Sequence, residues 1–460
     1  WRYFETFCTK ASHFLPPDNW QEQPPIGAAP RTSPTNIGLA LTSALAALDL
    51  GLADRESVTA LAENILHTLE ALPKWRGHIY NWYDTRTLRS LAPEYISTVD
   101  SGNLAACLLV FRAGMIEYGR TDLASRAAAL YEAMDFSPLY DKSRRLFLIG
   151  LDLSSGTPAK GWYDLMASEA RLTGYIAVAR GDAPRRHWRQ LSRVLVQKDG
   201  FRGMASWTGT MFEYLMPELF LPLSRESLLW ESAKFCMYVQ RRRSRGAVPW
   251  GVSESAFLSL DPALAYRYKA HGCAALALKR GMDDELVVSP YSAFLALVIE
   301  PENALKNLRK LEKLGALGPF GFWEAVDFTP SRCRFEKGEL VRCVMAHHVG
   351  MSLCAACNYL CGGAMQKRFI SDPAMAAYRG FIEEKIPVGG VLLRRRGAEP
   401  PEKPARTPVE GWEKHGGDTD LASPECTLLS NGVYSVLLTD SGLSSAWAGC
   451  VGIYPGPDGP

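Results

Sequence analysis

Paired helical patterns recur along most of the chain and constrain its fold more than any other feature. Residues 37–50 are apolar on nearly every face, as in a fully buried helix, whereas residues 56–71 are amphipathic. Further helical segments are predicted at 101–117, 121–134, 165–180, 184–196, 226–242, 262–279, 288–297, 301–313, 347–361 and 372–384. Strand-like alternation before residue 390 is limited to short pieces such as residues 146–153, which could form one arm of a hairpin. Alternating inner and outer helices predict an all-α domain, an (α/α)6 toroid with its loops gathered at one end.

Composition changes near the end of this helical region. With 460 residues and 47% hydrophobic content, the chain can bury a large core as one toroidal domain or as two ordinary ones. Residues 1–393 are predicted to form the toroid, and residues 394–422 contain a proline-rich, charged stretch typical of a linker. An Asn-Gly turn between alternating apolar residues predicts that residues 423–460 are the truncated start of a β-sandwich. Because the sequence begins at Trp1 rather than Met, we expect it to be a piece of a longer polypeptide.

Charge and cysteine usage exclude several classes of partner. The formal net charge is +2, from 51 basic and 49 acidic residues, so nucleic acid is not an expected partner. The short basic run 241–245 is interpreted as a helix end. Eleven unevenly spaced cysteines favour a reducing compartment, with the cytoplasm as the default. Cys354, Cys357 and Cys361 lie in an apolar stretch without a second ligand pair, which indicates buried thiols rather than a metal site.

Motifs for cofactor chemistry and for membrane insertion are not found in the sequence. It contains no GxGxxG, Walker loop, HExxH or GxSxG pattern, so no cofactor and no metal are expected. No apolar stretch approaches the roughly 20 uncharged residues of a membrane span. We therefore expect no direct membrane contact from this segment.

Five aromatic-rich loops that carry acidic residues, amides or imidazoles point to a different chemistry. They cover residues 77–85, 206–218, 248–257, 321–330 and 345–352. Any one such loop is more often a cap on the core than a binding site. Together they have the composition of a carbohydrate site, because sugar rings present apolar faces between polar hydroxyl edges.

Cleavage of a glycosidic bond needs two carboxyl groups, and the loops offer several. Glu254 lies between Trp250 and Phe257, where desolvation would raise its pKa, and is the first candidate. Glu169 starts an otherwise apolar helix and is either a helix-dipole partner or a catalytic carboxyl. A binding or structural role is favoured over acid–base work for the remaining candidates, which are Asp100, Asn103, Glu213 and Glu324.

Two adjacent histidines, His347 and His348, cannot form the i, i+4 pair that binds zinc on a helix. Their side chains point about 100° apart on a helix. The prediction is that one faces the site and the other packs in the core.

Long, specific motifs run through residues 1–393 and include LPPDNWQEQPP, RTSPTNIG, RGHIYNWYDTRTL, STVDSGNL, MASEARLTGYIAVARGDAPRRHW, PWGVSESAF, VVSPYSAFLAL, GFWEAVDFTPSRC and MAHHVGMSL. With these motifs, residues 1–393 resemble the central domain of cyclic β-1,2-glucan synthases. The resemblance implies a glycoamylase-like (α/α)6 domain that closes linear β-1,2-glucan into a ring. It also implies a glycosyltransferase region and a phosphorylase-like region as partner domains of one polypeptide, on the cytoplasmic side of a larger inner-membrane enzyme.

The same resemblance implies roles for individual residues in a retaining transglycosylation. Glu254 is the expected nucleophile and Glu169 the expected acid/base, the pair being more secure than its direction. Tyr163, Arg171 and Trp250 are expected to tune them. The expected substrate-binding residues are Trp75, Arg76, His78, Tyr80, Trp82, Asp84, Asp100, Asn103, Trp207, Glu213, Trp250, Tyr268, Lys269, His271, Trp323, Glu324 and His347.

Two other functions stay open at this point. An endo-β-1,2-glucanase could use the same fold, with an activated water in place of the acceptor sugar. A catalytically inactive module that only holds glucan for neighbouring domains would bind without turnover.

Overall fold

The chain divides into two compact units, Trp1–Arg395 and Arg396–Pro460, which are described separately. The computed structural model describes residues 1–246, 248–333, 337–385, 426–431, 433–439, 444–448 and 451–454. The predicted linker, residues 394–422, lies outside the described residues.

Three long helices form the centre of the first unit: α2 (Pro34–Asp49), α4 (Thr98–Glu117) and α12 (Ala346–Leu360). The first helix packs against the other two, and its residues 34–47 are all buried. Small residues allow this close packing, because a methyl group on Gly38 would come within 2.9 Å of the Cys107 Cβ. The all-round apolar pattern of residues 37–50 therefore reflects a helix enclosed by other helices.

Amphipathic helices cover this centre. α3 (Arg55–Ala71) begins at Asp54, whose carboxylate accepts a hydrogen bond from the Ser57 amide at 2.8 Å. It packs with α5 (Thr121–Glu132), which in turn covers α4. The other helices are α1 (Arg2–Phe7), α6 (Arg171–Arg180), α7 (Arg186–Gln190), α8 (Met211–Leu215), α9 (Leu228–Ser244), α10 (Pro290–Leu295), α11 (Pro301–Lys313), α13 (Ala364–Ile370) and α14 (Pro373–Ala377).

Short strands are far more frequent than the sequence patterns predict, so the expectation that strands are scarce before residue 390 is wrong. Most have two to four residues, too few for an alternating pattern to be recognised. The strands are β1 (Asn19–Gln21), β2 (Gly27–Ala28), β3 (Arg31–Thr32), β4 (Asn81–Asp84), β5 (Ser90–Ser97), β6 (Tyr140–Asp141), β7 (Leu146–Leu148), β8 (Gly150–Asp152), β9 (Thr157–Pro158), β10 (Trp162–Tyr163), β11 (Leu195–Lys198), β12 (Phe201–Met204), β13 (Glu254–Leu260), β14 (Tyr266–Ala270), β15 (Val287–Val288), β16 (Leu317–Gly318), β17 (Gly321–Phe322), β18 (Ala325–Asp327), β19 (Glu339–Val341) and β20 (Cys343–Met345).

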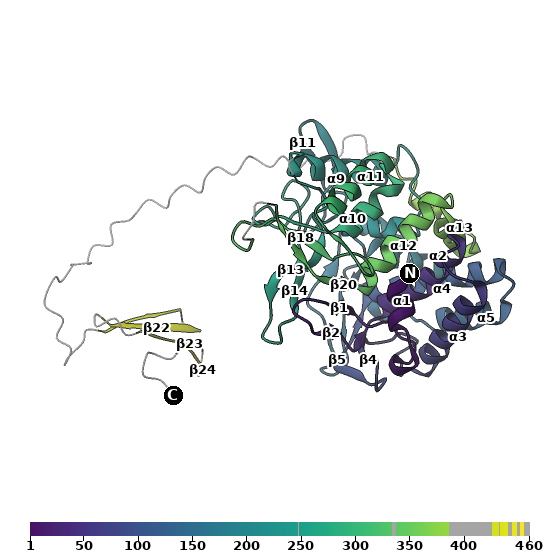
Figure 1. Ribbon diagram of the computed structural model, residues 1–460, viewed down its shortest axis with the longest axis horizontal. Coiled ribbons are helices and arrows are strands. Elements are labelled where there is room, and N and C mark those ends of the chain that lie inside the picture. Colours follow the sequence, from purple (N-terminus) through teal and green to yellow (C-terminus); the bar gives the residue numbers. More distant parts are fainter. Residues whose placement is uncertain are drawn as a thin grey trace. The chain divides into compact units, whose positions relative to one another are not determined.

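These strands form small antiparallel sheets beside the helices. The largest has the order β3-β4-β5-β8-β9, and two three-stranded sheets have the orders β2-β1-β20 and β15-β18-β19. β13 and β14 pair as a hairpin, with Glu254 opposite Ala270 and Ala256 opposite Tyr268. In Figure 1 the labelled strands β1, β2, β4, β5, β13 and β14 lie to the left of and below the helices of this unit. These strands therefore lie together on one side of the helices in this view.

Most predicted helices are present, with differences at particular places. Residues 262–279 are not a helix but include β14, and the segment 184–196 ends as a helix at Gln190 before β11 begins. The segment 165–180 becomes helical only at Arg171, which leaves Glu169 in the turn before α6. The segment 146–153 contributes β7, which pairs with β6 as the predicted hairpin arm.

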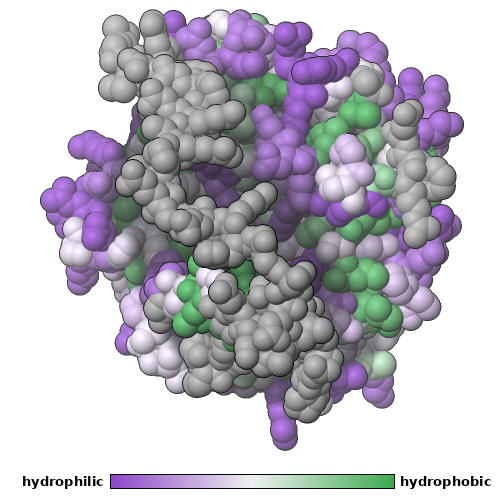
Figure 2. All heavy atoms as spheres, turned by 90° about the vertical axis from the view of Figure 1, so that its left-hand side faces the viewer, coloured by the Kyte–Doolittle hydropathy of each residue, from purple (hydrophilic) through white to green (hydrophobic). Residues whose placement is uncertain are grey.

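One helix, α4, has the length and hydropathy of a membrane-spanning segment. Most of it is buried inside the protein, as expected for the core helix of a globular domain. On the face in Figure 2, hydrophilic residues dominate among the visible described residues, and hydrophobic ones form small separate groups.

In the second unit the described residues form one antiparallel sheet. Its strands β21 (Cys426–Ser430), β22 (Tyr434–Thr439), β23 (Ser444–Ala448) and β24 (Val451–Tyr454) follow one another in sequence order. This up-and-down arrangement agrees with the strand and turn pattern of the sequence.

Candidate functional site

A cavity of about 630 Å³ lies among the strands and helix ends of the first unit. Segments far apart in the sequence form its wall, from the β1 strand to the start of α12. Its lining residues include Asp18, Asn19, Arg31, Thr35, Trp82, Asp100, Asn103, Tyr163, Glu169, Phe212, Glu254, Tyr266, Tyr268 and His347. Carboxylates, amides and aromatic rings therefore face one another across a space large enough for a small-molecule or oligosaccharide unit.

Glu254 enters the cavity as the first residue of β13, and its backbone is fixed on both sides. The Tyr291 hydroxyl donates to the Glu254 carbonyl oxygen at 3.0 Å, and the preceding Ser253 hydroxyl accepts from the Phe212 amide at 3.0 Å. Burial raises the pKa of the Glu254 carboxyl to about 8, with further contributions from Glu169 and other nearby carboxylates. A hydrogen bond from Tyr268 acts in the opposite direction and lowers this pKa. Glu254 therefore holds a proton more strongly than an exposed carboxyl would.

Glu169 faces the same cavity from the turn that precedes α6. The Ser168 hydroxyl donates to Glu169 Oε2 at 3.2 Å. Burial and, to a lesser extent, the negative charge of Glu213 raise the pKa of Glu169 to about 7. Two carboxyl groups in one cavity do not both ionise readily, and the state with one proton between them supplies the acid and the ionised partner of a glycosyl-transfer pair.

Arg171 stabilises the turn that carries Glu169. Its buried guanidinium donates to the Ser168 carbonyl at 3.0 Å and to the Glu213 carbonyl at 2.9 Å, and it pairs with Glu218 at 2.6 Å. Tyr163 lines the cavity on the other side, and burial, followed by the charge of Glu169, raises the pKa of its hydroxyl well above the usual value. Tyr163 therefore stays protonated as a hydrogen-bond donor.

Thr35 of α2 and Asp100 and Asn103 of α4 form a polar wall of the same cavity. Thr35 donates to Asp100 Oδ1 at 2.6 Å and accepts from Asn103 Nδ2 at 3.0 Å. Asp18 pairs with Arg31 at 2.9 Å, and the Arg31 guanidinium lies 4.8 Å from the centre of the Trp82 ring. An aromatic face beside charged and amide groups suits a sugar ring with its hydroxyl edges.

The structure brings some of the expected site residues together and leaves others elsewhere. The expected catalytic and substrate-binding residues that line the cavity are Trp82, Asp100, Asn103, Glu169, Glu254, Tyr268 and His347. His347 thus faces the cavity, whereas His348 is 4% exposed and stacks on Tyr291, which confirms the prediction that one histidine faces the site and one packs.

Glu213 and Trp250 lie outside the cavity lining. Glu213 is 7% exposed at the start of α8, and its carboxylate accepts hydrogen bonds from the hydroxyl and amide groups of Thr208 and Thr210. It completes a capping box with Thr210. Trp250 is 7% exposed, and its amide donates to the Asn307 side chain. Both have the contacts of structural residues.

Trp323 and Glu324 line a different, largely apolar cavity of about 270 Å³. Trp323 stacks on Trp20, with ring centres 6.0 Å apart. Glu324 accepts from the Ala256 amide at 3.2 Å, and its Oε1 lies 2.9 Å from His348 Nδ1. Glu324 is therefore adjacent to the hairpin that carries Glu254, but outside the main cavity.

The predicted substrate-binding residues of the loop 75–84, other than Trp82, do not line the cavity and instead contact neighbouring protein groups. Arg76 pairs with Asp135 at 3.1 Å, and the ring of His78 lies 2.8 Å from the carbonyl oxygen of the same residue. Trp75 bridges to His78, the Tyr80 amide donates to the Tyr83 hydroxyl, and Asp84 pairs with Arg86. Trp207, by contrast, is 45% exposed and donates its indole N–H to Asp164 at 2.9 Å.

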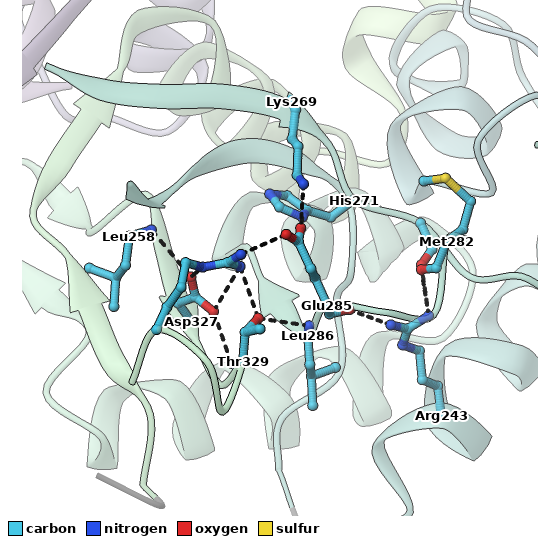
Figure 3. A network of polar contacts seen from close by, with 11 residues as sticks. Arg243, Leu258, Lys269, His271, Met282, Glu285, Leu286, Asp327 and Thr329 are labelled. Atoms are coloured by element: carbon cyan, nitrogen blue, oxygen red, sulfur yellow. Dashed lines mark hydrogen bonds and ion pairs between the residues drawn. The ribbon is translucent and has the colours of Figure 1, made fainter. Parts of the chain in front are cut away.

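Lys269 and His271 belong to a polar network behind the β13–β14 hairpin (Figure 3). Lys269 pairs with Glu285 at 2.6 Å, and His271 Nδ1 lies 3.1 Å from the same carboxylate. Arg332 joins Glu285 to the fully buried Asp327, which accepts a hydrogen bond from the Leu258 amide of β13. The network therefore ties both strands of the hairpin to the protein body.

Sequence reasoning did not select Asp18, Asn19, Arg31, Thr35 or Tyr266 for the site. Asp18 and Asn19 precede Trp20, an acid–amide–aromatic combination like that of the five recognised loops. This signal could have marked the segment as a sixth loop, whereas nothing in the local pattern separates Tyr266 from an ordinary strand residue.

Metal-binding geometry is not found among the described residues, where no group of three or more His, Cys, Asp or Glu side chains could hold an ion. Cys354 and Cys357 are buried in α12, and Cys361 is half-buried at its end. Burial raises the pKa of the Cys354 thiol to about 12, so this group is an inert, protonated side chain.

Solved structures with the same fold belong to carbohydrate-related proteins. A putative glucoamylase from Bacteroides caccae superposes with a TM-score of 0.67 at 19% identity, covering 83% of this chain and 95% of its own. An endo-β-1,2-glucanase from Chitinophaga pinensis, solved with sophorotriose and glucose, superposes with a TM-score of 0.66 at 16% identity, covering 83% of this chain and 95% of its own. An endo-β-1,2-glucanase mutant from Talaromyces funiculosus, solved with β-1,2-glucan, superposes with a TM-score of 0.66 at 13% identity, covering 83% of this chain and 87% of its own. At these identities the likeness establishes the fold.

The fold and the acid-lined cavity define a glycoamylase-like domain, and residues 162–373 match the family described as putative glucoamylase. This segment contains both cavity glutamates, Glu169 and Glu254. Over 98% of its length the chain is also 32% identical to the cyclic β-(1,2)-glucan synthase NdvB of Rhizobium meliloti, of which it spans about a fifth (20%). These matches confirm the resemblance found in the sequence: residues 162–373 match the glycoamylase family model, and nearly the whole chain is similar to one part of a cyclic β-1,2-glucan synthase.

Proposed function

We propose that this chain is a retaining transglycosylase that cyclises linear β-1,2-glucan on an (α/α)6 toroid. The observation that carries the proposal is the pairing of Glu169 and Glu254 in one cavity, where burial raises the pKa of both and the charge of Glu169 adds to the shift of Glu254. The relationship to a cyclic β-(1,2)-glucan synthase supports the choice of substrate and outcome.

In the first step, the Glu254 carboxylate attacks the anomeric carbon of a glucosyl unit and forms a covalent glycosyl-enzyme. Glu169 donates its proton to the departing glycosidic oxygen, so the leaving chain departs as a neutral alcohol. The raised pKa of Glu169, about 7, keeps this carboxyl partly protonated near neutral pH, whereas Glu254, whose pKa is about 8, must lose its proton before it attacks.

In the second step, a hydroxyl at the non-reducing end of the same glucan attacks the glycosyl-enzyme. Glu169, now ionised, accepts the hydroxyl proton, and Glu254 leaves as a carboxylate. Both glutamates return to their starting states and the ring closes without a net proton change. The polar wall of Thr35, Asp100 and Asn103 is placed to hold sugar hydroxyls during both steps.

The larger protein would provide the remaining activities. Because the chain spans about a fifth of the synthase relative, we propose that it works beside glycosyltransferase and phosphorylase-like domains of one polypeptide. We place it on the cytoplasmic side of an inner-membrane enzyme. On the same view, residues 394–422 are a linker and residues 423–460 begin the next domain.

Hydrolysis is the second candidate, since endo-β-1,2-glucanases have this fold. In that reaction an activated water takes the place of the acceptor hydroxyl. A binding module without catalysis would leave both glutamates without a chemical role.

The test of the proposal is to trap the covalent intermediate. The Glu169→Gln variant, incubated with a β-1,2-linked glucosyl fluoride whose fluoride leaves without needing a proton, should accumulate a glycosyl-enzyme whose added mass maps to the peptide that contains Glu254. Glu254→Gln should give no adduct, and both variants should lose activity by at least about a thousandfold. The matched control, Glu302→Gln, changes an exposed carboxyl on α11 and should behave as the wild type. Full activity in Glu254→Gln, or a product of inverted configuration, would contradict the retaining mechanism.

A further inference from the structure

A second group of buried polar side chains lies directly behind the hairpin that carries Glu254. Glu324 and His348 are each 4% exposed, and Glu324 Oε1 lies 2.9 Å from His348 Nδ1. His348 Nε2 lies 3.4 Å from the hydroxyl of Tyr268, the cavity residue that hydrogen-bonds Glu254. Four side chains thus form a continuous line from the core to the cavity: Glu324, His348, Tyr268 and Glu254.

We propose that Glu324 and His348 are positioning residues that turn the hydroxyl proton of Tyr268 toward the Glu254 carboxylate. This inference rests on the proposed function, in which Glu254 is the nucleophile. No bond to substrate is made by either residue, and no proton is transferred along the line.

The geometry restricts how the parts of this line can move. The ring of Tyr291 stacks on His348 with centres 3.6 Å apart and planes 9° apart. The hydroxyl of Tyr291 is fixed in turn by the Glu254 carbonyl oxygen at 3.0 Å and by Ser253 at 2.8 Å. Cross-strand pairing sets Tyr268 opposite Ala256, diagonal to Glu254 and on the same face of the hairpin. The imidazole plane and the tyrosine ring are therefore held by packing.

The direction of donation follows from burial. Burial raises the pKa of Glu324 to about 8 and lowers the pKa of His348 to about 3, so both groups are uncharged near neutral pH. A protonated Glu324 donates to His348 Nδ1, which leaves the imidazole proton on Nε2. The Nε2–H then donates to the Tyr268 oxygen, and the proton of Tyr268 is available to Glu254.

An ionised Glu324 would reverse this order. It would accept a hydrogen bond from Nδ1–H of His348, which leaves a lone pair on Nε2. The Tyr268 hydroxyl would then donate its hydrogen bond to Nε2 instead of to Glu254. His347 Nε2 lies 3.3 Å from the same hydroxyl and is a competing acceptor. The titratable groups that face Glu324 and Tyr268 from the surrounding elements are Asp18, Glu254, Tyr291, Cys343, His347 and His348.

Three variants separate a positioning role from a structural one. Glu324→Gln keeps an N–H donor for His348 Nδ1, Glu324→Met has similar bulk without a donor, and Tyr268→Phe removes only the terminal hydroxyl. Losing the donor raises the pKa of Glu254, because its ionised form is no longer hydrogen-bonded. The limb of the pH–rate profile that reports Glu254 should therefore move up by about one pH unit in Glu324→Met and Tyr268→Phe.

The expected rates follow the same logic. Glu324→Met should lower kcat by about tenfold to a hundredfold with KM unchanged, whereas Glu324→Gln should stay within about threefold of the wild type. Ser352→Ala, which alters a contact one helical turn beyond His348, is the control and should match the wild type. Equal losses in Glu324→Gln and Glu324→Met, or a fall in kcat with no movement of the limb that reports Glu254, would overturn the proposal.

A measurement without turnover separates this proposal from the proposed function. Infrared difference spectra of protein with carbon-13-labelled glutamate, wild type minus Glu254→Gln, report the ionisation of Glu254 across a pH range. Tyr268→Phe should shift this titration upward whether or not Glu254 proves to be the nucleophile. If Glu254→Gln is inactive but the titration is the same in Tyr268→Phe, the positioning proposal fails while the proposed function stands. If Glu324→Met does not fold, Tyr268→Phe and Glu324→Gln decide the outcome by the same two readouts.

Discussion

At the scale of single residues, Glu169 and Glu254 carry the argument for catalysis. The pKa of each is raised mainly by burial, and the charge of Glu169 adds to the shift of Glu254. A raised pKa in a folded protein means that ionisation is unfavourable there relative to the unfolded chain. The site therefore costs stability at the pH at which it would work.

This cost predicts how stability depends on pH. The pKa of Glu254 is about 8 in the fold against an ordinary value of 4.5, so its contribution to stability is fully present below pH 4.5 and is lost as pH rises to about 8. Glu254→Gln removes this loss. Its melting temperature should exceed that of the wild type by roughly 1–3 °C at pH 8, with little difference at pH 4.5.

Thermal unfolding followed by circular dichroism at both pH values checks this expectation. Glu302→Gln on α11 is the control, because it makes the same exchange at an exposed side chain. A Glu254→Gln variant that gains nothing between pH 4.5 and pH 8 would show that the carboxyl ionises freely in the fold.

At the scale of elements, the β13–β14 hairpin is the part that positions the site. It carries Glu254 and Tyr268 on one face and is tied to the protein body through Leu258 and Lys269. Asp327, with a fully buried side chain, and Glu285 receive these ties, and Arg332 joins the two carboxylates. The placement of Glu254 thus depends on an ion network outside the cavity.

Removing Arg332 should therefore affect both stability and activity. Arg332→Ala leaves the buried Asp327 carboxylate without its cation, which costs about 3–5 kcal/mol of unfolding free energy. The hairpin should also lose its fixed position, and kcat should fall together with stability. Urea unfolding and glucan turnover, measured on the same preparation, give the two quantities.

The matched control is Arg342→Ala, which breaks an exposed ion pair with Glu22. Such a pair contributes at most about 1 kcal/mol. If Arg332→Ala were no more destabilising than Arg342→Ala, the network would not anchor the hairpin.

The long helices were predictable from the sequence, and the short strands were not. Residues 34–49 and 55–71 show the two helical patterns clearly because a helix of this length samples several turns of the period. The predicted helix over residues 262–279 is wrong. β14 has only five residues, and its conformation depends on its partner strand rather than on a local pattern.

The same division applies to the site. Glu169 and Glu254 were found because the chemistry requires carboxyl groups in aromatic surroundings, and the structure brings both to one cavity. Residue type alone did not distinguish them from Glu213, whose carboxylate is occupied by the donors of a capping box. Which carboxyl faces the cavity depends on tertiary contacts that no local pattern records.

At the scale of the whole molecule, we propose that the first unit closes a glucan rather than cutting it. The glycoamylase-like fold and the paired carboxyls serve hydrolysis and transglycosylation equally. The outcome depends on whether the cavity holds an acceptor sugar or a water when the glycosyl-enzyme forms. Only the product distinguishes these cases.

The most direct test is to incubate the protein with linear β-1,2-glucan, digest the products with an exo-acting β-glucosidase, and weigh the survivors by mass spectrometry. Ring closure predicts resistant products that are one water lighter than linear chains of the same length. Short linear sugars that the exo-enzyme removes completely would instead identify a hydrolase. Substrate that remains unchanged would contradict any catalytic role.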